Sequence, residues 1–244
     1  DERSIHLGTL GPMFHVEVND EVEVVFKNMA DEPHTITLRN LMGECFMVRE
    51  QNEEGVAPGQ RKTYTWYVPE SAGPAARDPN CVARSYESTT NPIMDSNAGL
   101  LGAFAVCRQG TLDEDGNRRD DNTREFAVNF QTIDENESHH SRENFKKFAR
   151  RRKDVNDPEF VESNMMHAVN GKIFFNTPGL NMTVGSCTYW YSVQSGGEDS
   201  LNPQKYHGHP VMYNTNGLIS RRSVVVSGRS EERRVGKECR SRWS

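Results

Sequence analysis

The sequence contains no long hydrophobic run and few hydrophobic residues overall. Its longest apolar segment, residues 99–107 (GLLGAFAVC), has the length of one buried strand and is far too short to cross a membrane, since a spanning helix needs about 20 mostly apolar residues. Hydrophobic residues make up 34% of the 244 residues, below the roughly 45–50% of an average globular chain. We therefore expect a polar globular chain without a membrane segment, of one large domain or two of ordinary size.

An excess of basic charge and closely spaced cysteine pairs are also missing. The formal net charge is −6, which argues against nucleic acid as the main partner. No two cysteines form a CxxC pair, so neither thioredoxin-type redox chemistry nor a four-thiolate zinc site is supported. The chain begins with Asp1 and shows no secretory leader, from which we expect that its natural start is missing.

Residues 229–244 differ in character from the rest of the chain. This segment, RSEERRVGKECRSRWS, carries six basic and three acidic residues without apolar periodicity, and it resembles the translation of a sequencing-adapter oligonucleotide. We exclude it from the fold argument; a genuine basic tail is the alternative. Without it the formal net charge falls from −6 to −9, and we expect a different natural sequence after Gly228.

Alternating hydrophobicity predicts strands through most of the chain. Val22, Val24 and Phe26 alternate with Glu23 and Val25, and Tyr64 and Trp66 alternate with threonine and tyrosine, as in half-buried strands. Many short strands separated by Gly, Pro and Asn are typical of an antiparallel sandwich or barrel. Further strands are expected at residues 14–18, 100–106, 125–133, 168–175, 188–193 and 223–226.

A polar stretch with both acidic and basic residues divides this pattern into two units. Residues 108–123 (RQGTLDEDGNRRDDNT) resemble a linker. We predict an all-β chain of two related units, residues 1–107 and 124–228, with residues 229–244 outside both. One short helix is expected at residues 141–152, where Phe145 and Phe148 are spaced by three.

Several segments, in order along residues 6–228, resemble the ceruloplasmin, hephaestin and coagulation-factor A-domain group of the multicopper oxidase family. In the first unit these are residues 6–12 (HLGTLGP), 56–59 (VAPG), 64–66 (YTW) and 98–102 (AGLLG). In the second unit they are residues 134–138 (DENES), 162–164 (ESN), 166–171 (MHAVNG), 178–180 (PGL) and 190–191 (WY). The resemblance implies two tandem cupredoxin-like (plastocyanin-like) Greek-key β-sandwiches or barrels. Both would be incomplete, the first lacking its first strands and the second its last.

The resemblance also implies a disulfide between Cys81 and Cys107, which enclose the AGLLG segment. A hairpin easily brings together two residues that are 26 apart, and closing that loop contributes about 3 kcal/mol to stability. A thiolate pair for a metal ion is the alternative. Cys45 is interpreted as a buried free thiol, and Cys187 is left unassigned.

An extracellular location is consistent with these features. Disulfides persist in oxidising compartments, and sequons at Asn136 and Asn181 provide glycosylation sites that suit a secreted protein. We expect a secreted protein, or the extracellular side of a membrane-anchored one.

Copper is the cofactor that the resemblance implies. Enzymes of the family oxidise a substrate, often Fe(II), at a blue-copper site and pass the electrons to a trinuclear cluster that reduces oxygen to water. Imidazole and thiolate are copper ligands, and the two histidines of an HxH pair on a strand point to the same face. At the corresponding positions this chain carries other residues, namely Thr37, Arg39, Glu87, Thr89, Asn202 and Lys205.

Two histidines, His207 and His209, remain near the last of these positions. They are candidates for a copper contact, although a scaffold or surface role is the alternative because a tight site usually needs three or more ligands. Lys205 would add a cation where a metal cation should bind, which opposes binding. No catalytic residue is assigned.

The other histidines give weaker signals. His139 and His140 adjoin a polar segment, and adjacent side chains point in different directions on regular elements, so we expect this pair to be solvated. His34 lies near the first substituted HxH pair but out of register with it.

Two functional hypotheses from different classes follow. In the first, the chain is a fragment of a multicopper-oxidase-like protein of the ferroxidase type, with other cupredoxin domains of the same parent as partners, Fe(II) as a substrate and copper bound elsewhere; the fragment alone would be inactive. In the second, it belongs to a copper-poor cupredoxin scaffold that acts as a binding or cofactor module, as coagulation-factor A domains do. Stoichiometric copper and a blue absorption band in the full-length protein separate the two. A third interpretation is that frame damage makes residues 195–227 misrepresent the natural sequence.

Overall fold

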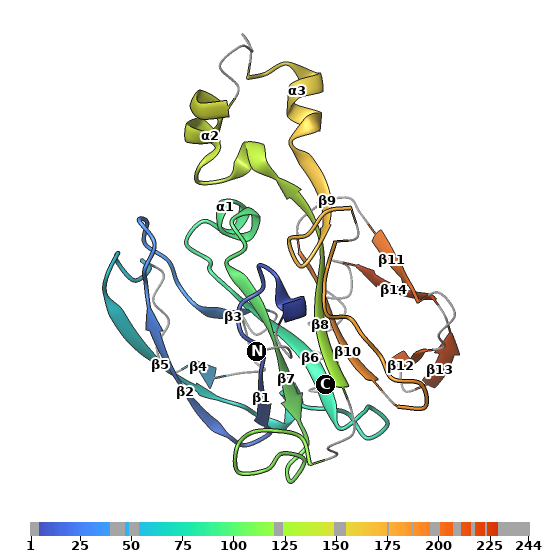
Figure 1. Ribbon diagram of the computed structural model, residues 1–244. Coiled ribbons are helices and arrows are strands. Elements are labelled where there is room, and N and C mark those ends of the chain that lie inside the picture. Colours follow the sequence, from blue (N-terminus) through green and yellow to red (C-terminus); the bar gives the residue numbers. More distant parts are fainter. Residues whose placement is uncertain are drawn as a thin grey trace, which may run out of the picture.

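A computed structural model of the chain describes residues 5–39, 47–48, 54–119, 124–148, 155–174, 176–186, 188–195, 201–206, 211–215, 218–222 and 224–228. Strands dominate these ranges and the helices are short, so the expected all-β fold is confirmed (Figure 1). Within the described ranges, no helix has the length and apolar character that crossing a membrane requires.

The first part of the chain, residues 5–107, forms two sheets. One has the strand order β2-β5-β4 and is antiparallel, with β2 (Glu21–Lys27), β5 (Arg61–Tyr67) and β4 (Met47–Val48). The other has the order β1-β7-β6-β3, with β1 (Phe14–Glu17), β7 (Leu101–Cys107), β6 (Cys81–Glu87) and β3 (Thr37–Arg39). In this second sheet β1 runs parallel to β7, and the other neighbours are antiparallel.

One hydrophobic core lies between these two sheets. Tyr64 and Trp66 on β5 are buried, while Thr65 between them is half-buried. On β2 the half-buried Val22 and Val24 alternate with exposed residues and pack against the same core. The period-two pattern in the sequence therefore identified the inward faces of these strands correctly. The buried members of the core are Val16, Leu38, Val56, Tyr64, Trp66, Val68, Ala72, Tyr86, Phe104 and Val106.

β7 is buried along its whole length and on both faces. Its residues Phe104 and Val106 belong to the core between the two sheets. Its odd-numbered residues belong to two other clusters, which include Leu112, Ala127 and Tyr191 from later in the chain. One strand thus contributes to the interior of the first part and to its contact with the second.

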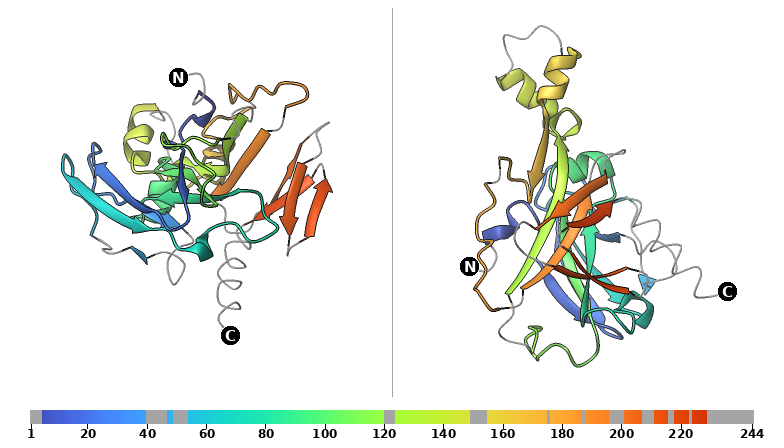
Figure 2. Two further views of the ribbon diagram at one scale, coloured as in Figure 1. Left: turned by 90° about the horizontal axis from the view of Figure 1, so that it is seen from below. Right: turned by 90° about the vertical axis from the view of Figure 1, so that its right-hand side faces the viewer.

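The second part of the chain, residues 124–228, is centred on β8. The strand order there is β10-β8-β9, with β8 (Arg124–Asp134), the parallel β10 (Thr188–Ser195) and the antiparallel β9 (Met165–Val169). Two further antiparallel pairs join β11 (Leu201–Lys205) to β14 (Val224–Gly228) and β12 (Val211–Thr215) to β13 (Leu218–Arg222), and they lie along one side of the molecule (Figure 2).

The helices lie at the ends of strands. η3 (Glu135–Glu137), α2 (Ser141–Phe148) and α3 (Pro158–Ser163) project beyond β8 and β9, as Figure 1 shows. The short elements of the first part are η1 (Ile5–Leu7), η2 (Glu70–Ala72) and α1 (Pro92–Asn97).

Three short α-helices are present in the described ranges where the sequence predicted one. The expected helix begins at Ser141 and its described part ends at Phe148, while residues 149–154 lie outside the described ranges. The two others begin with a capping side chain followed by proline: Asn91 before Pro92, and Asp157 before Pro158. This is a standard helix start, so both helices were missed although the sequence carried their signal.

One predicted strand needs correction, and the predicted linker contains local structure. The strand expected at 168–175 ends at Val169, because Asn170 and Gly171 adopt φ values of 51° and 72° and turn the chain. The expected linker, residues 108–123, is structured over its described part: a β-bridge joins Leu112 to Arg118, and both are buried.

Candidate metal centre

Three of the substituted copper-ligand positions come together at one edge of the first part. Thr37 on β3 lies directly opposite Glu87 on β6. The hydroxyl oxygens of Thr37 and Thr89 are 3.3 Å apart, and the Thr89 hydroxyl is also 3.1 Å from that of Thr35. The Thr89 backbone N–H donates to the Thr35 hydroxyl at 2.8 Å. We call Thr35, Thr37 and Thr89 the threonine cluster.

The threonine cluster and Glu87 do not fit a copper centre. Copper sites in proteins are built mainly from imidazole nitrogen and cysteine or methionine sulfur, whereas this position offers hydroxyl groups that hydrogen-bond to one another. Glu87 is buried, with 7% of its surface exposed. Arg39 follows two residues after Thr37 on β3. The chemistry of the residues present therefore assigns no copper ligand to this edge.

The ligand positions of the second part are only partly described. Asn202 and Lys205 lie on β11, opposite Ser227 and Val224 of β14. His207 and His209 lie outside the described residues, as do Cys45 and Cys187. A copper contact of the two histidines stays a prediction.

Beside the threonine cluster, two histidines approach one buried carboxylate. His34 forms a β-bridge with Val56, Asp95 lies on α1, and His139 follows η3. The Nε2 atom of His139 is 2.7 Å from Oδ1 of Asp95, and the Nδ1 atom of His34 is 3.2 Å from the same oxygen. We call these three residues the His–Asp–His cluster.

The His–Asp–His cluster is largely shielded from water. The side chain of Asp95 is 0% exposed, that of His34 is 7% exposed and that of His139 is 17% exposed. The two imidazole rings meet edge to face, with centroids 5.4 Å apart. A carboxylate buried this deeply requires hydrogen-bonding or charged partners.

The local sequence fixes the orientation of Asp95. Asn91 caps α1, and the backbone of Asp95 donates to the carbonyl of Asn91 one turn earlier. Oδ2 of Asp95 accepts hydrogen bonds from the Ser88 hydroxyl at 2.7 Å and from the Asn91 N–H at 3.0 Å. Ser88 in turn accepts from the N–H of Thr35, which links the two clusters. Oδ1 is thereby directed at the two imidazoles.

The expectation that His139 is solvated is wrong, whereas His140 is exposed and lies 3.9 Å from Glu143. Local patterns gave no signal for the cluster, because His139 meets Asp95 from 44 residues away in the chain. Only the packing of the second part against the first brings the three residues together.

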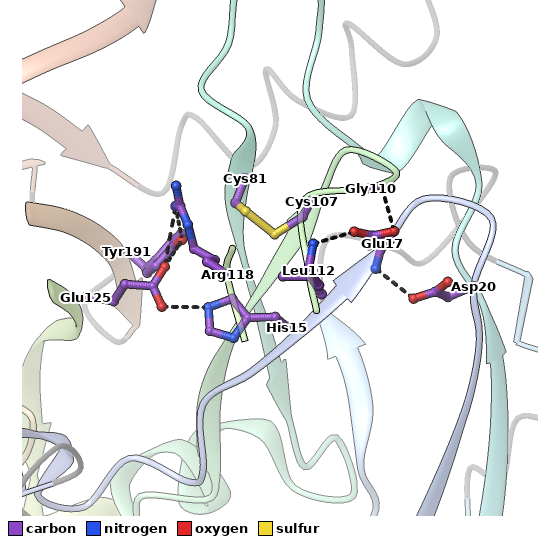
Figure 3. Close-up of a disulfide and its surroundings, with 10 residues drawn as sticks. All are labelled: His15, Glu17, Asp20, Cys81, Cys107, Gly110, Leu112, Arg118, Glu125 and Tyr191. Carbon is purple, nitrogen blue, oxygen red and sulfur yellow. Dashed lines mark hydrogen bonds and ion pairs between the residues drawn. A yellow bond between two sulfur atoms is a disulfide. The ribbon is translucent and has the colours of Figure 1, made fainter. Parts of the chain in front are cut away.

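A second polar cluster lies near the opposite end of β7, beside the disulfide between Cys81 and Cys107 (Figure 3). The two cysteines are directly opposite each other on β6 and β7. Glu125 on β8 lies 2.8 Å from Nε2 of His15 and 3.4 Å from Nη1 of Arg118, and it accepts a hydrogen bond of 2.7 Å from the Tyr191 hydroxyl. We call His15, Arg118, Glu125 and Tyr191 the arginine cluster.

Burial, hydrogen bonds and charges shift the pKa values of two groups in the arginine cluster. Burial raises the pKa of Glu125, but the hydrogen bonds and charges of His15, Tyr191 and Arg118 outweigh burial and hold that pKa below its ordinary value. Burial first, and then the charge of Glu125, raise the pKa of Tyr191. Glu125 is therefore a carboxylate and Tyr191 a neutral phenol at neutral pH.

The two predicted glycosylation sites differ in their surroundings. Asn181 lies exposed in the loop that precedes β10. Asn136 is half-buried, and its side-chain nitrogen donates to Oδ1 of Asp134 at 2.7 Å and to the carbonyl of Val161 at 2.9 Å. A glycan on Asn136 would replace one of these two donated hydrogens, so the two sequons are not equivalent acceptors.

No protein-family model matches the chain. Among curated proteins, it is 42% identical over 212 residues to Ferroxidase HEPHL1 of Mus musculus, 39% over 217 residues to Ceruloplasmin of Homo sapiens and 37% over 226 residues to Hephaestin of Mus musculus. These alignments cover 85%, 88% and 90% of the chain but only 18%, 20% and 19% of those proteins. The chain thus spans about a fifth of the length of the curated relatives it matches.

Solved structures show the same fold at lower sequence similarity. A blue copper oxidase from Nitrosomonas europaea superimposes with a TM-score of 0.56 at 18% identity, covering 89% of this chain and 62% of that one. The multicopper oxidase mgLAC gives a TM-score of 0.56 at 16% identity, covering 89% and 63%. At this identity the match concerns the cupredoxin fold alone.

Proposed function

Because the chain belongs to the multicopper oxidase family of the ceruloplasmin and hephaestin type, we propose that it is a domain pair of a larger, ferroxidase-type protein. In that protein Fe(II) oxidation would be coupled to the reduction of oxygen. The observation that supports the ferroxidase type is the identity of 37–42% to a ferroxidase, ceruloplasmin and hephaestin along most of the chain. Other cupredoxin domains of the same parent are the proposed partners.

Within that protein, we assign residues 5–119 the role of a framework that contributes no copper ligand at the positions the family resemblance marks. The threonine cluster carries this proposal, since Thr37 and Thr89 hydrogen-bond to each other where histidines would bind copper. The units 1–107 and 124–228 remain our proposed domain division.

The proposed location is extracellular. The Cys81–Cys107 disulfide supports it, because such bonds persist in oxidising compartments. Glycosylation at the exposed Asn181 is part of the same proposal.

The test compares the chain with its full-length parent after loading both with copper. We expect the parent to bind copper stoichiometrically, to show a blue absorption band and to oxidise Fe(II), and the 244-residue chain alone to show no oxidase activity. A parent that lacks both copper and the blue band would exclude the oxidase function.

The second candidate function is a copper-poor binding scaffold, and the substitutions at Thr37, Glu87 and Thr89 favour it. Replacing ligand positions by mutually hydrogen-bonded hydroxyls keeps the fold without the metal. The copper measurement on the parent separates the two functions: a stably folded parent without copper supports the scaffold.

A further inference from the structure

We propose that the His–Asp–His cluster is a binding site for a divalent first-row transition-metal ion of the zinc class. The site consists of His34, Asp95 and His139, none of which is a position that the family resemblance marked for copper. The proposal rests on the geometry of these three side chains and is independent of the proposed function.

The three ligand atoms are close enough to share one ion. One nitrogen of each histidine and one oxygen of Asp95 all lie within 4.8 Å of one another. Two ligand atoms of a tetrahedral zinc site, each about 2.0–2.1 Å from the ion, are separated by roughly 3.3 Å. The distance of 3.2 Å between Nδ1 of His34 and Oδ1 of Asp95 matches this separation. The distance of 2.7 Å from His139 is shorter, so its ring must move by a fraction of an ångström to accommodate an ion.

A buried imidazole nitrogen of the cluster lacks a directed hydrogen bond. Nδ1 of His34 is inaccessible to solvent and has no hydrogen-bond partner of acceptable geometry among the described residues. Although Oδ1 of Asp95 is only 3.2 Å away, the two atoms are not aligned as donor and acceptor. Buried polar atoms are nearly always satisfied, and a metal ion between the two atoms would satisfy both.

The donor set selects the class of ion. Two imidazoles and one carboxylate match divalent first-row ions such as Zn²⁺, Co²⁺, Fe²⁺ and Cu²⁺. Calcium and magnesium require a shell of oxygen ligands, and copper(I) prefers sulfur. Three protein ligands leave at least one coordination position for water.

The carboxylate is held in place before any ion binds. Its second oxygen is fixed by the hydroxyl of Ser88 and the N–H of Asn91. Such contacts behind a ligand orient it toward the metal and raise affinity. His139 provides the access route, because its side chain is 17% exposed while the other two ligands lie deeper.

A bound ion would tie the two parts of the chain together. His34 and Asp95 belong to the first part, whereas His139 belongs to the second. A cross-link between segments far apart in sequence restricts the unfolded chain more than a local one does. Metal binding should therefore raise the unfolding temperature of the whole chain.

The experiment titrates the metal-free 244-residue chain with Zn²⁺ by calorimetry and with Co²⁺ by visible absorption. The variants are His34→Gln and His139→Gln, and the matched control is His140→Gln. His140 neighbours His139 but has a side chain that is 66% exposed and lies outside the cluster. Far-UV circular dichroism checks that each variant folds.

We expect the wild type and His140→Gln to bind one Zn²⁺ with equal affinity and to gain thermal stability from it. His34→Gln and His139→Gln should each bind about tenfold more weakly or worse, since losing even an outer partner of a ligand costs 10–100-fold. Absence of stoichiometric binding by the wild type would overturn the proposal, and so would unchanged affinity in His139→Gln. If His34→Gln does not fold, the comparison of His139→Gln with His140→Gln decides alone.

Discussion

The arginine cluster and the His–Asp–His cluster both join the two parts of the chain through a buried carboxylate, but they differ in what faces that carboxylate. Glu125 meets Arg118, whose charge is permanent, the His15 imidazole, and a phenol that donates a hydrogen bond. Asp95 meets two imidazoles, which can be neutral and then offer lone pairs. The first arrangement gives its carboxylate a permanent cation, whereas the second places imidazoles at one oxygen of its carboxylate, as a metal site would require.

The largest effect that would test this comparison is expected from Arg118→Met. The change leaves Glu125 without its permanent cation, and removing one partner of a buried pair costs about 3–5 kcal/mol. Arg118 is 6% exposed and also stacks on Tyr189 at 3.6 Å. Urea unfolding measures the loss in unfolding free energy, and the control is Lys27→Met at an exposed position. A loss below about 1 kcal/mol would show that the arginine cluster is not a structural unit.

A slightly smaller effect is expected from the double change Cys81→Ala and Cys107→Ala. It opens the loop closed by the disulfide, whose sequence separation is 26, at a cost of about 3 kcal/mol. Thermal and urea unfolding are compared with and without reductant. Reductant should destabilise the wild type and leave the double variant unchanged; sensitivity in the variant would mean that another disulfide supports this side of the molecule.

Asp95→Asn should lower the free energy of unfolding by less, about 1–2 kcal/mol in the absence of metal. The amide keeps an acceptor for Ser88 and Asn91 but loses the charge that strengthens the contact with His139. Urea unfolding in the presence of a chelator measures it, with the surface change Asp31→Asn as control. A loss as large as that of Arg118→Met would place both clusters in the same structural class.

The smallest effect concerns acidification. The pKa of Glu125 is lower in the folded chain than its ordinary value of 4.5. Its contribution to stability is therefore complete above that value and disappears as the pH falls through the lower, folded value. The free energy of unfolding, measured from about pH 6 to pH 3, should fall less steeply for Glu125→Gln than for the wild type. Equal slopes would show that the partners of Glu125 do not favour its charged form.

The strands of the first part could be predicted because their periodicity is local. Local patterns indicate directly which residues are buried, namely the alternation in β2 and β5 and the continuous apolar run of β7. The end of β9 was missed although Asn170 and Gly171 form a local turn signal. Tertiary contacts reinforce that turn, because the buried Asn170 side chain accepts from the N–H of Asn129 and donates to the carbonyls of His6 and Ala127.

The site was less predictable than the fold. Family resemblance marked Thr37, Glu87 and Thr89, and the structure brings them to one edge. It gave no indication of the His–Asp–His cluster, since His34 and His139 are each unremarkable in their own segments. Their significance arises only where α1 and the end of η3 meet, at Asp95.

Because β7 is buried on both faces, it determines the shortest fragment of this chain that can be expressed on its own. A protein cut after Cys107 would expose the odd-numbered face of β7, which is lined by leucine, alanine and the disulfide. That face has no charged residue to keep it in water, so the truncated piece should self-associate. For protein engineers the boundary of an expressible fragment therefore lies beyond β10, whatever the boundary of the repeated unit in the sequence.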